Sequence, residues 1–191
     1  LFFQTGFTSN NSVALSGGNK NSGYFMSYSY FDQKGIVPTT YFKRHSFFAK
    51  YTSQITEKLS SSFQLTYSNS RQRRTPEGVT FGQPGPIFVT YNQPISWNPK
   101  PVYFPDGRQR VFRTGRNNPY WDLDNVYNKY AVNRFIPVIS FNYQLNKWLS
   151  VSERLGADIF AEQDNYRSSP STALNTSGRL VENNINYRQF N

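Results

Sequence analysis

The residues best suited to binding chemistry are aromatic and basic side chains gathered between residues 71 and 126. Aromatic rings can stack on sugar faces or fill the side-chain pockets that a peptide needs, and arginines can grip carboxylates or sulfates through bidentate hydrogen bonds. The alternative is that the rings only pack this segment against its neighbours or a partner, and the sequence leaves both interpretations open. The candidate ligand- or partner-contacting residues are Trp97, Tyr103, Phe104, Arg108, Arg110, Arg113, Tyr120 and Trp121.

The same segment carries most of the positive charge of the chain. Residues 71–116 hold eight basic residues against two acidic ones, so +6 of the net charge of +10 lies there. Such a surface suits an anionic ligand, lipopolysaccharide or a protein partner. A solvated loop with incidental charge is the alternative.

No set of residues suited to catalysis accompanies this segment. His45 is the only histidine, and its place in an expected strand favours a structural role. Asp122 and Asp124 could bind calcium together with loop carbonyls, although turn capping is the favoured interpretation. Cysteine is absent, which rules out disulfides and thiolate metal sites. We therefore expect a protein that is not an enzyme and that has no cofactor and no metal site.

The elements that must position these residues are expected to be strands. Aromatic residues make up 18% of the chain although hydrophobic residues make up only 37%, which argues against disorder and against a helical bundle. Residues 59–68 alternate strictly: Leu59, Ser61, Phe63, Leu65 and Tyr67 fall on one face, and only Ser, Thr and Gln fall on the other. This pattern is typical of a transmembrane β-barrel wall, with lipid outside and a watery lumen inside.

The expected strands cover residues 11–17, 23–32, 42–55, 59–70, 127–145 and 149–160, and a seventh begins near Val181. Tight turns follow the first, third and fifth strands, and longer loops at 33–41, 71–126 and 161–177 follow the others. An outer-membrane barrel sorts its connections in this way because only one rim faces the periplasm. Aromatic residues near strand ends, which would suit interfacial girdles, are Tyr24, Tyr41, Phe42, Tyr67, Tyr130, Tyr143, Trp148 and Tyr166. The chain opens with Leu1 and no leader pattern, and we expect both ends to be cuts within a longer polypeptide.

Several local motifs resemble the barrel of SusC/RagA-like TonB-dependent transporters. Residues 15–38 read LSGGNKNSGYFMSYSYFDQKGIVP and resemble the first part of that barrel, which residues 42–46, FKRHS, continue. Residues 117–121, NNPYW, and 133–135, NRF, resemble the exit from the long loop of the family. Residues 148–151, WLSV, and 156–158, GAD, resemble the next turn and strand. The matches occur in order and cover about residues 1–165.

The resemblance implies an all-β fold, an antiparallel up-and-down transmembrane barrel of which residues 1–191 supply about six or seven of some 22 strands. It implies that residues 71–126 form a long extracellular loop and that no plug domain lies in this chain. It further implies an importer of oligosaccharides or peptides in the outer membrane of Bacteroidetes-type bacteria. The implied partners are a SusD-like lipoprotein, TonB through parts outside this chain, outer-membrane lipid including lipopolysaccharide, and a glycan or peptide substrate, but no nucleic acid.

Two other functions remain open from the sequence. A SusC-like barrel could serve as a scaffold in a larger outer-membrane assembly or secretion complex, with the basic loop as its docking surface. A soluble β-sandwich binding module, such as a lectin, is the third choice. The sorted loop lengths and the family motifs argue against that module.

Overall fold

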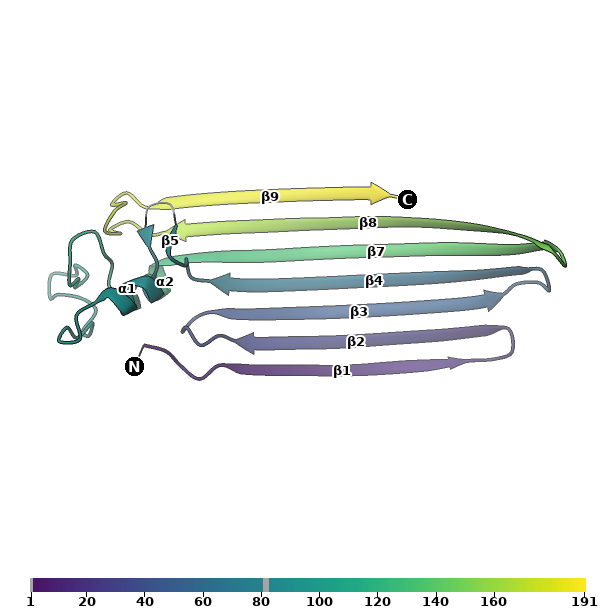
Figure 1. Cartoon of the computed structure of the whole chain (residues 1–191), viewed down its shortest axis with the longest axis horizontal. Helices are drawn as coiled ribbons and strands as arrows, with labels where there is room; N and C mark the ends of the chain where they lie inside the picture. Colours follow the sequence, from purple (N-terminus) through teal and green to yellow (C-terminus); the bar gives the residue numbers. More distant parts are fainter. Residues whose placement is uncertain (1, 81–82) are drawn as a thin grey trace.

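The computed structural model describes residues 2–80 and 83–191, and its main feature is one sheet of seven antiparallel strands (Figure 1). The order in the sheet is β1-β2-β3-β4-β7-β8-β9, so every long strand pairs with the next long strand along the chain. These strands are β1 (Phe7–Gly18), β2 (Ser22–Lys34), β3 (Tyr41–Gln54), β4 (Leu59–Arg74), β7 (Val126–Asn146), β8 (Leu149–Ser168) and β9 (Arg179–Phe190). The small elements are β5 (Val79–Thr80), β6 (Gln83–Pro84), α1 (Pro86–Asn92) and α2 (Pro119–Asn125).

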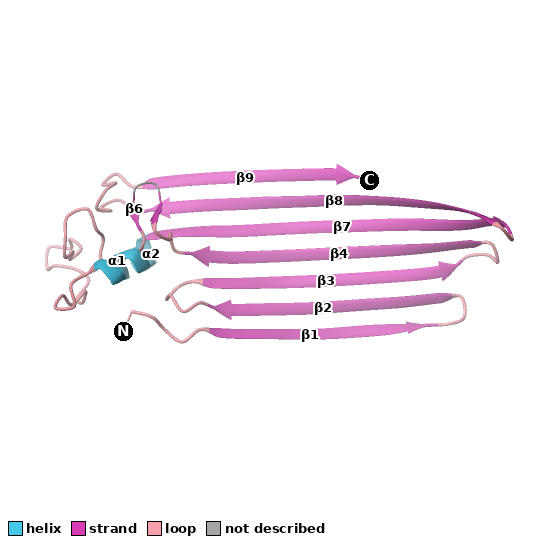
Figure 2. Ribbon diagram, viewed as in Figure 1, coloured by secondary structure: helices cyan, strands magenta, loops and turns pink. Residues whose placement is uncertain are grey.

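The connections are sorted between the two ends of the sheet. Short turns at residues 19–21, 55–58 and 147–148 lie at one end, and residues 35–40, 75–125 and 169–178 make the connections at the other. Figure 2 shows both helices and the longest loops gathered at this second end, which we call the loop end. The predicted antiparallel up-and-down arrangement is therefore confirmed.

One face of the sheet, here called the apolar face, carries exposed hydrophobic side chains on neighbouring strands. Directly opposite residues of paired strands share a face, and Phe63 of β4 lies between Tyr51 of β3 and Ile139 of β7. Phe63 is 42% exposed and Leu15, near the end of β1, is 57% exposed. The exposed large residues of this face include Phe7, Val13, Leu15, Tyr24, Met26, Tyr28, Tyr51, Phe63, Tyr67, Phe135, Ile139, Phe141, Tyr143, Val151, Leu155, Leu180 and Phe190.

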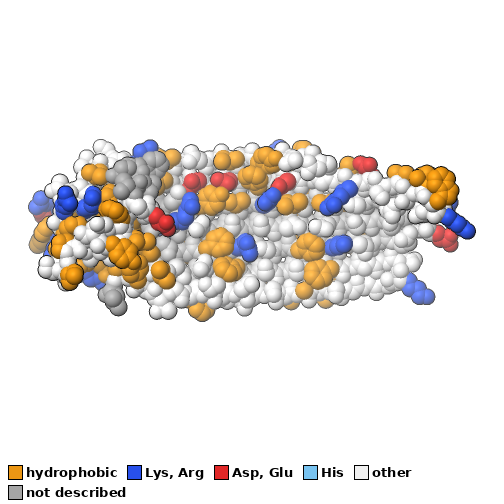
Figure 3. Space-filling view, viewed as in Figure 1, with side chains coloured by type: hydrophobic (Ala, Val, Ile, Leu, Met, Phe, Trp, Pro, Cys, Tyr) orange, Lys and Arg blue, Asp and Glu red, His pale blue; other side chains and the backbone are white. Residues whose placement is uncertain are grey.

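The opposite face, here called the polar face, is lined by small polar residues and scattered charges. Figure 3 shows separate hydrophobic groups among polar and charged side chains rather than a continuous apolar surface. Phe48, which breaks the alternation of β3, lies on this face with its ring centroid 5.9 Å from that of Phe25. Glu153, which breaks the alternation of β8, lies on the apolar face opposite Phe141.

The structure differs from the expectation at the starts of two loops and within the long connection. The polar loop expected from residue 161 begins only after Ser168, because β8 continues and pairs with β7 on one side and β9 on the other. Backbone ladder bonds do not depend on side-chain polarity, so a polar stretch between two partners remains a strand. For the same reason β4 reaches Arg74, and the long connection begins at residue 75, not 71. That connection also holds α1, α2 and the β5–β6 pair, which the sequence did not predict.

The buried hydrophobic residues of the described chain lie at the loop end, where the ends of β7 and β8 contribute Val126 and Tyr166. One cluster joins Phe2, Val37 and Leu123, and a second joins Trp121, Val126 and Tyr166. Tyr166 is therefore part of a core rather than of an aromatic girdle. Phe42 and Tyr130 of the expected girdle lie on the polar face, whereas Tyr24, Tyr67 and Tyr143 lie on the apolar face.

Among the described helices, none has the length and hydropathy that crossing a membrane would require.

Candidate functional site

The loop end is held together by a polar cluster, here called the loop base, formed by the buried residues Asn117, Asn118 and Asp122 and the partly buried Gln109. Asn118 caps α2, because its side-chain oxygen accepts a hydrogen bond from the backbone N–H of Tyr120 at 3.0 Å, and Pro119 follows at the first helical position. The amide nitrogen of Asn118 donates to the carbonyl oxygens of Pro99 at 2.7 Å and Arg110 at 2.9 Å. One side chain thus fixes two further parts of the long loop to the start of α2.

Asn117 ties the long loop to the connection between β8 and β9. Its side-chain oxygen accepts hydrogen bonds from the backbone N–H of Ala173 at 2.7 Å and from Gln109 Nε2 at 3.0 Å. Gln109 Nε2 also donates to the carbonyl of Ser171 at 2.7 Å. Asn117 is fully buried, so these bonds replace water and hold the two loops at a fixed relative position.

Asp122 is the buried carboxyl group of the loop base. Its Oδ1 accepts a hydrogen bond of 2.7 Å from Asn117 Nδ2, whereas its Oδ2 has no partner within the described residues. Burial raises the pKa of Asp122 to about 8 despite that hydrogen bond, so the group is mostly protonated at neutral pH. Asp124, two residues later, is exposed. The two carboxyl groups therefore have different surroundings, and Asp122 serves the loop base.

The aromatic candidates fall into different environments. Trp121 is only 6% exposed and packs on Val126 and Tyr166, so its ring supports the loop base and is not free to stack on a ligand. Tyr120 is partly buried: its ring centroid lies 5.4 Å from that of Phe2, and Lys100 Nζ lies 4.6 Å from its centre. Both rings are occupied by contacts within the chain.

Trp97, Tyr103 and Phe104 lie farther out on the long loop. Residues 102–110 form a small hairpin, in which the backbone N–H of Phe104 donates to the carbonyl of Arg108. Tyr103 and Phe104 are 49% and 45% exposed on this hairpin. Trp97 is partly buried, with its ring centroid 5.5 Å from that of Phe112. These rings can contact a partner or ligand in addition to the loop itself.

The three arginines are likewise used differently. Arg108 pairs with Asp106, its Nε 2.7 Å from the carboxylate, and hydrogen bonds from Arg108 hold the pKa of Asp106 below its usual value. Arg110 Nη1 donates to the carbonyl of Pro101 at 2.9 Å. Arg108 and Arg110 both lie 5.9 Å from the centre of the Phe104 ring, whereas Arg113 is exposed. Only Arg108 is thus neutralised by a carboxylate within the described residues, and Arg113 is the most accessible of the three to an external anion.

His45 lies on the apolar face, near the loop end of β3. Its Nδ1 is 2.8 Å from the hydroxyl of Tyr28, and its ring centroid is 4.6 Å from that of Tyr30. In the described part of the chain, no three His, Asp or Glu side chains come together as a possible metal site. His45 thus packs among tyrosine side chains of the sheet, which favours a structural role.

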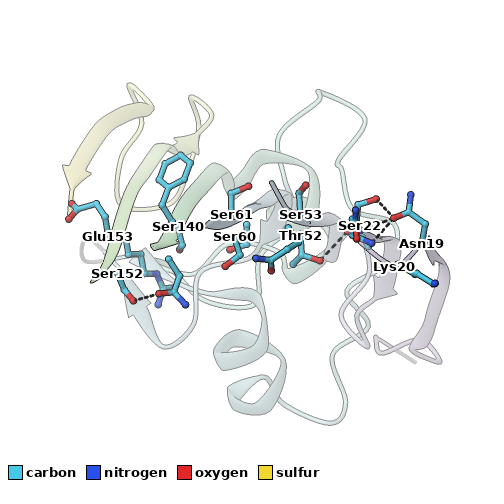
Figure 4. A pocket seen from close by; sticks show the side chains of 17 residues that line it. Asn19, Lys20, Ser22, Thr52, Ser53, Ser60, Ser61, Ser140, Ser152 and Glu153 are labelled. Carbon is cyan, nitrogen blue, oxygen red and sulfur yellow. Dashed lines mark hydrogen bonds between the residues drawn. The ribbon is translucent and has the colours of Figure 1, made fainter. Parts of the chain in front are cut away.

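A shallow trough hollows the polar face near the short turns. It is lined by Thr52, Ser60, Ser140 and Ser152 together with the turn at Asn19, as Figure 4 shows. Ser152 donates to the side chain of Asn142 at 3.2 Å, and Thr52 donates to the carbonyl of Gly23 at 3.3 Å. These small polar side chains suit a hydrated inner wall better than a tight ligand pocket.

Asn117 and Asn118 hold the loop base together, although their residue types do not mark them as ligand contacts. The role of Asn118 could have been predicted from the sequence, because Asn followed by Pro at residues 118–119 is typical of a helix N-cap with proline at the first helical position. The partners of Asn117 were not predictable, because Ala173 lies 56 residues away in the chain.

Two curated proteins are similar to this chain in sequence. TonB-dependent receptor P26 of Formosa agariphila is 25% identical over 199 residues, which covers 94% of this chain and 19% of that protein. TonB-dependent receptor SusC of Bacteroides thetaiotaomicron is 28% identical over 122 residues, covering 62% of this chain and 12% of that protein. No family model matches the chain.

Two solved structures share the fold. The RagAB peptide importer in its "closed-closed" state superposes with a TM-score of 0.71 at 21% identity, covering 96% of this chain and 21% of that one. The RagAB peptide transporter gives a TM-score of 0.67 at 20% identity. The chain spans about a fifth or less of the length of these relatives. These findings confirm the resemblance stated from the sequence: the chain is similar in sequence to the TonB-dependent receptors P26 and SusC, and it shares the fold of part of the RagAB structures.

Proposed function

We propose that this chain forms wall and outer loops of an importer of oligosaccharides or peptides in the bacterial outer membrane. In this proposal TonB drives transport through parts of the protein outside this chain, and a SusD-like lipoprotein sits above the loop end. The observation that carries the proposal is the exposed apolar face backed by a face of small polar residues. A wall between lipid and a watery lumen needs both faces at once.

The loop end supports the outward, extracellular placement. Its connections are long and internally braced, whereas the opposite end has only short turns, as expected for the periplasmic rim. Exposed hydrophobic residues on the long loop offer a contact surface for a lipoprotein partner. They are Tyr91, Ile95, Tyr103, Phe104 and Val111, of which Ile95 is fully exposed.

The substrate class is proposed from the relatives and from the exposed loop side chains together. The solved structures include a peptide importer, and the resemblance stated from the sequence implies oligosaccharides or peptides, so pools of both are needed as test substrates. Arg113 on the loop would favour acidic members of either pool, because an exposed guanidinium can bind a carboxylate or sulfate.

Uptake measurements with the full-length protein test this proposal. Cells that produce the protein are compared with cells that lack it and with cells that lack TonB, using defined oligosaccharide and peptide pools. The importer predicts that uptake of the same compounds falls in both deficient strains. Unchanged uptake, with loss of a larger outer-membrane complex in cells lacking the protein, would instead indicate a scaffold.

A further inference from the structure

A groove with three basic side chains opens on the apolar face, just beyond the hydrophobic residues toward the loop end. We call it the basic groove; it has a volume of about 500 Å³ and is lined by Gln4, Lys34, Thr39, Thr40, Tyr41, Lys43 and Arg71. Its cations come from β2, β3 and β4. It is separate from the long-loop residues considered above as ligand contacts.

The basic groove gathers more positive charge than the chain neutralises. Lys43 stands directly opposite Arg71 on the neighbouring strand, and like charges in that position destabilise a sheet. Asp32 lies opposite Lys43 on the other side, with its Oδ2 3.6 Å from Lys43 Nζ. Within residues 2–80 and 83–191, Lys34 and Arg71 have no ion-pair partner. An anion bound between these strands would relieve the repulsion.

The depth of the basic groove relates it to the hydrophobic surface. On the apolar face of β3, Phe47, His45 and Lys43 follow one another toward the loop end. His45 lies directly opposite Tyr30 of β2 and Asn69 of β4. Four residues of strand tilted by about 40° correspond to about 10 Å of depth. Lys43 therefore lies at the level where lipid headgroups begin, since headgroups occupy about 5–8 Å on each side of the hydrocarbon.

We propose that the basic groove binds the phosphate group of a lipid in the surrounding outer leaflet. Lys34 and Lys43 provide ammonium groups, and Arg71 can donate two parallel hydrogen bonds to phosphate oxygens. The lipid is favoured over a soluble anion because the groove opens on the apolar face, so the acyl chains can lie along Tyr28 and Phe47. The inference rests on the membrane placement in the proposed function but not on transport.

Native mass spectrometry of the detergent-extracted, full-length protein tests the groove. The probes are diphosphorylated lipid A, the same lipid without its phosphates, and inorganic phosphate. The test variant combines Lys34→Gln, Lys43→Gln and Arg71→Gln. The matched control is Arg44→Gln, because Arg44 is exposed beside Lys43 but lies on the polar face. Heat-modifiable gel migration verifies that both variants fold.

The wild-type protein should retain the phosphorylated lipid, and the triple variant should bind it about 100-fold more weakly, at about fivefold per charge near a membrane surface. Arg44→Gln should bind as the wild type does. If the triple variant does not fold, Lys34→Gln and Arg71→Gln are measured singly, with about fivefold expected for each.

Unchanged binding by the folded variants would overturn the inference, as would an equal loss in Arg44→Gln or equal retention of phosphate-free lipid. Displacement of the lipid by millimolar inorganic phosphate would overturn its assignment to a lipid. Cargo uptake in the same strains is scored separately. Intact lipid binding without any uptake by the wild type would refute the importer and leave the groove standing.

Discussion

Replacing Leu65 by arginine is the most direct test of which face meets lipid. Leu65 lies on the apolar face between Ala49 and Pro137, so a longer side chain meets little steric obstruction there. It is four residues from Asn69, where the outward side of β4 turns polar, which is about 10 Å of depth for a strand tilted by about 40°. An apolar band about 25 Å tall therefore has Leu65 close to its middle.

At that depth an arginine costs about 2–4 kcal/mol, which lowers the folding equilibrium constant by roughly 30- to 900-fold. The assay is urea-dependent folding of the full-length protein into lipid vesicles, followed by heat-modifiable gel migration. Gln64→Arg is the matched control, because Gln64 is the adjacent residue and lies on the polar face. We expect the control to change stability by less than about 1 kcal/mol. Equal stability of the two variants would refute the assignment of faces.

Three further predictions concern the loop end. Between about pH 4 and 8 the unfolded state gives up the Asp122 proton before the folded state does, so the loop base loses stability as pH rises through this range. Asp122→Asn should remove that dependence, as measured by loop proteolysis against pH; a parallel pH profile would contradict it. Asn118→Ala should cost about 1–3 kcal/mol and speed cleavage of the long loop, because a cap and two carbonyl bonds are lost. Arg113→Ala should weaken uptake of acidic cargo a few-fold with unchanged proteolysis, whereas Arg110→Ala should also loosen the loop through Pro101.

The sheet could be predicted from the sequence wherever alternation and turns agree. Residues 59–68 specify both the strand and its two faces, because a one-residue shift would exchange every side chain between them. The same reasoning failed at residues 161–168, where no apolar alternation exists. There the strand is set by its two neighbours, since ladder bonds from β7 and β9 satisfy its backbone on both sides.

The candidate site was less predictable because its geometry depends on contacts between distant segments. An aromatic residue in a Pro-rich loop can stack on a ligand or fill a core, and residue type does not distinguish Trp121 from Tyr103. What separates them is burial: Trp121 packs on Val126 and Tyr166, whereas Tyr103 extends from a hairpin. Arg110 and Arg113 differ in the same way, since only a folded loop brings the carbonyl of Pro101 to Arg110.

The outward positions of β9 are mostly polar, and strand tilt explains why. Toward the short turns, the last outward hydrophobic residue of β2 is Tyr24, which lies in the same row across the sheet as Ile139 of β7. On β7 the outward hydrophobic residues continue beyond Ile139 to Leu145. Ladder bonds run across strands that tilt by about 40° in a barrel, so a level plane crosses each later strand nearer the short turns. On β9 the band should therefore begin nearer the turns, and its first outward hydrophobic residue beyond Arg188 is Phe190, opposite Ala157. The polar outward positions of β9 thus agree with a tilted membrane wall, because they lie above the band.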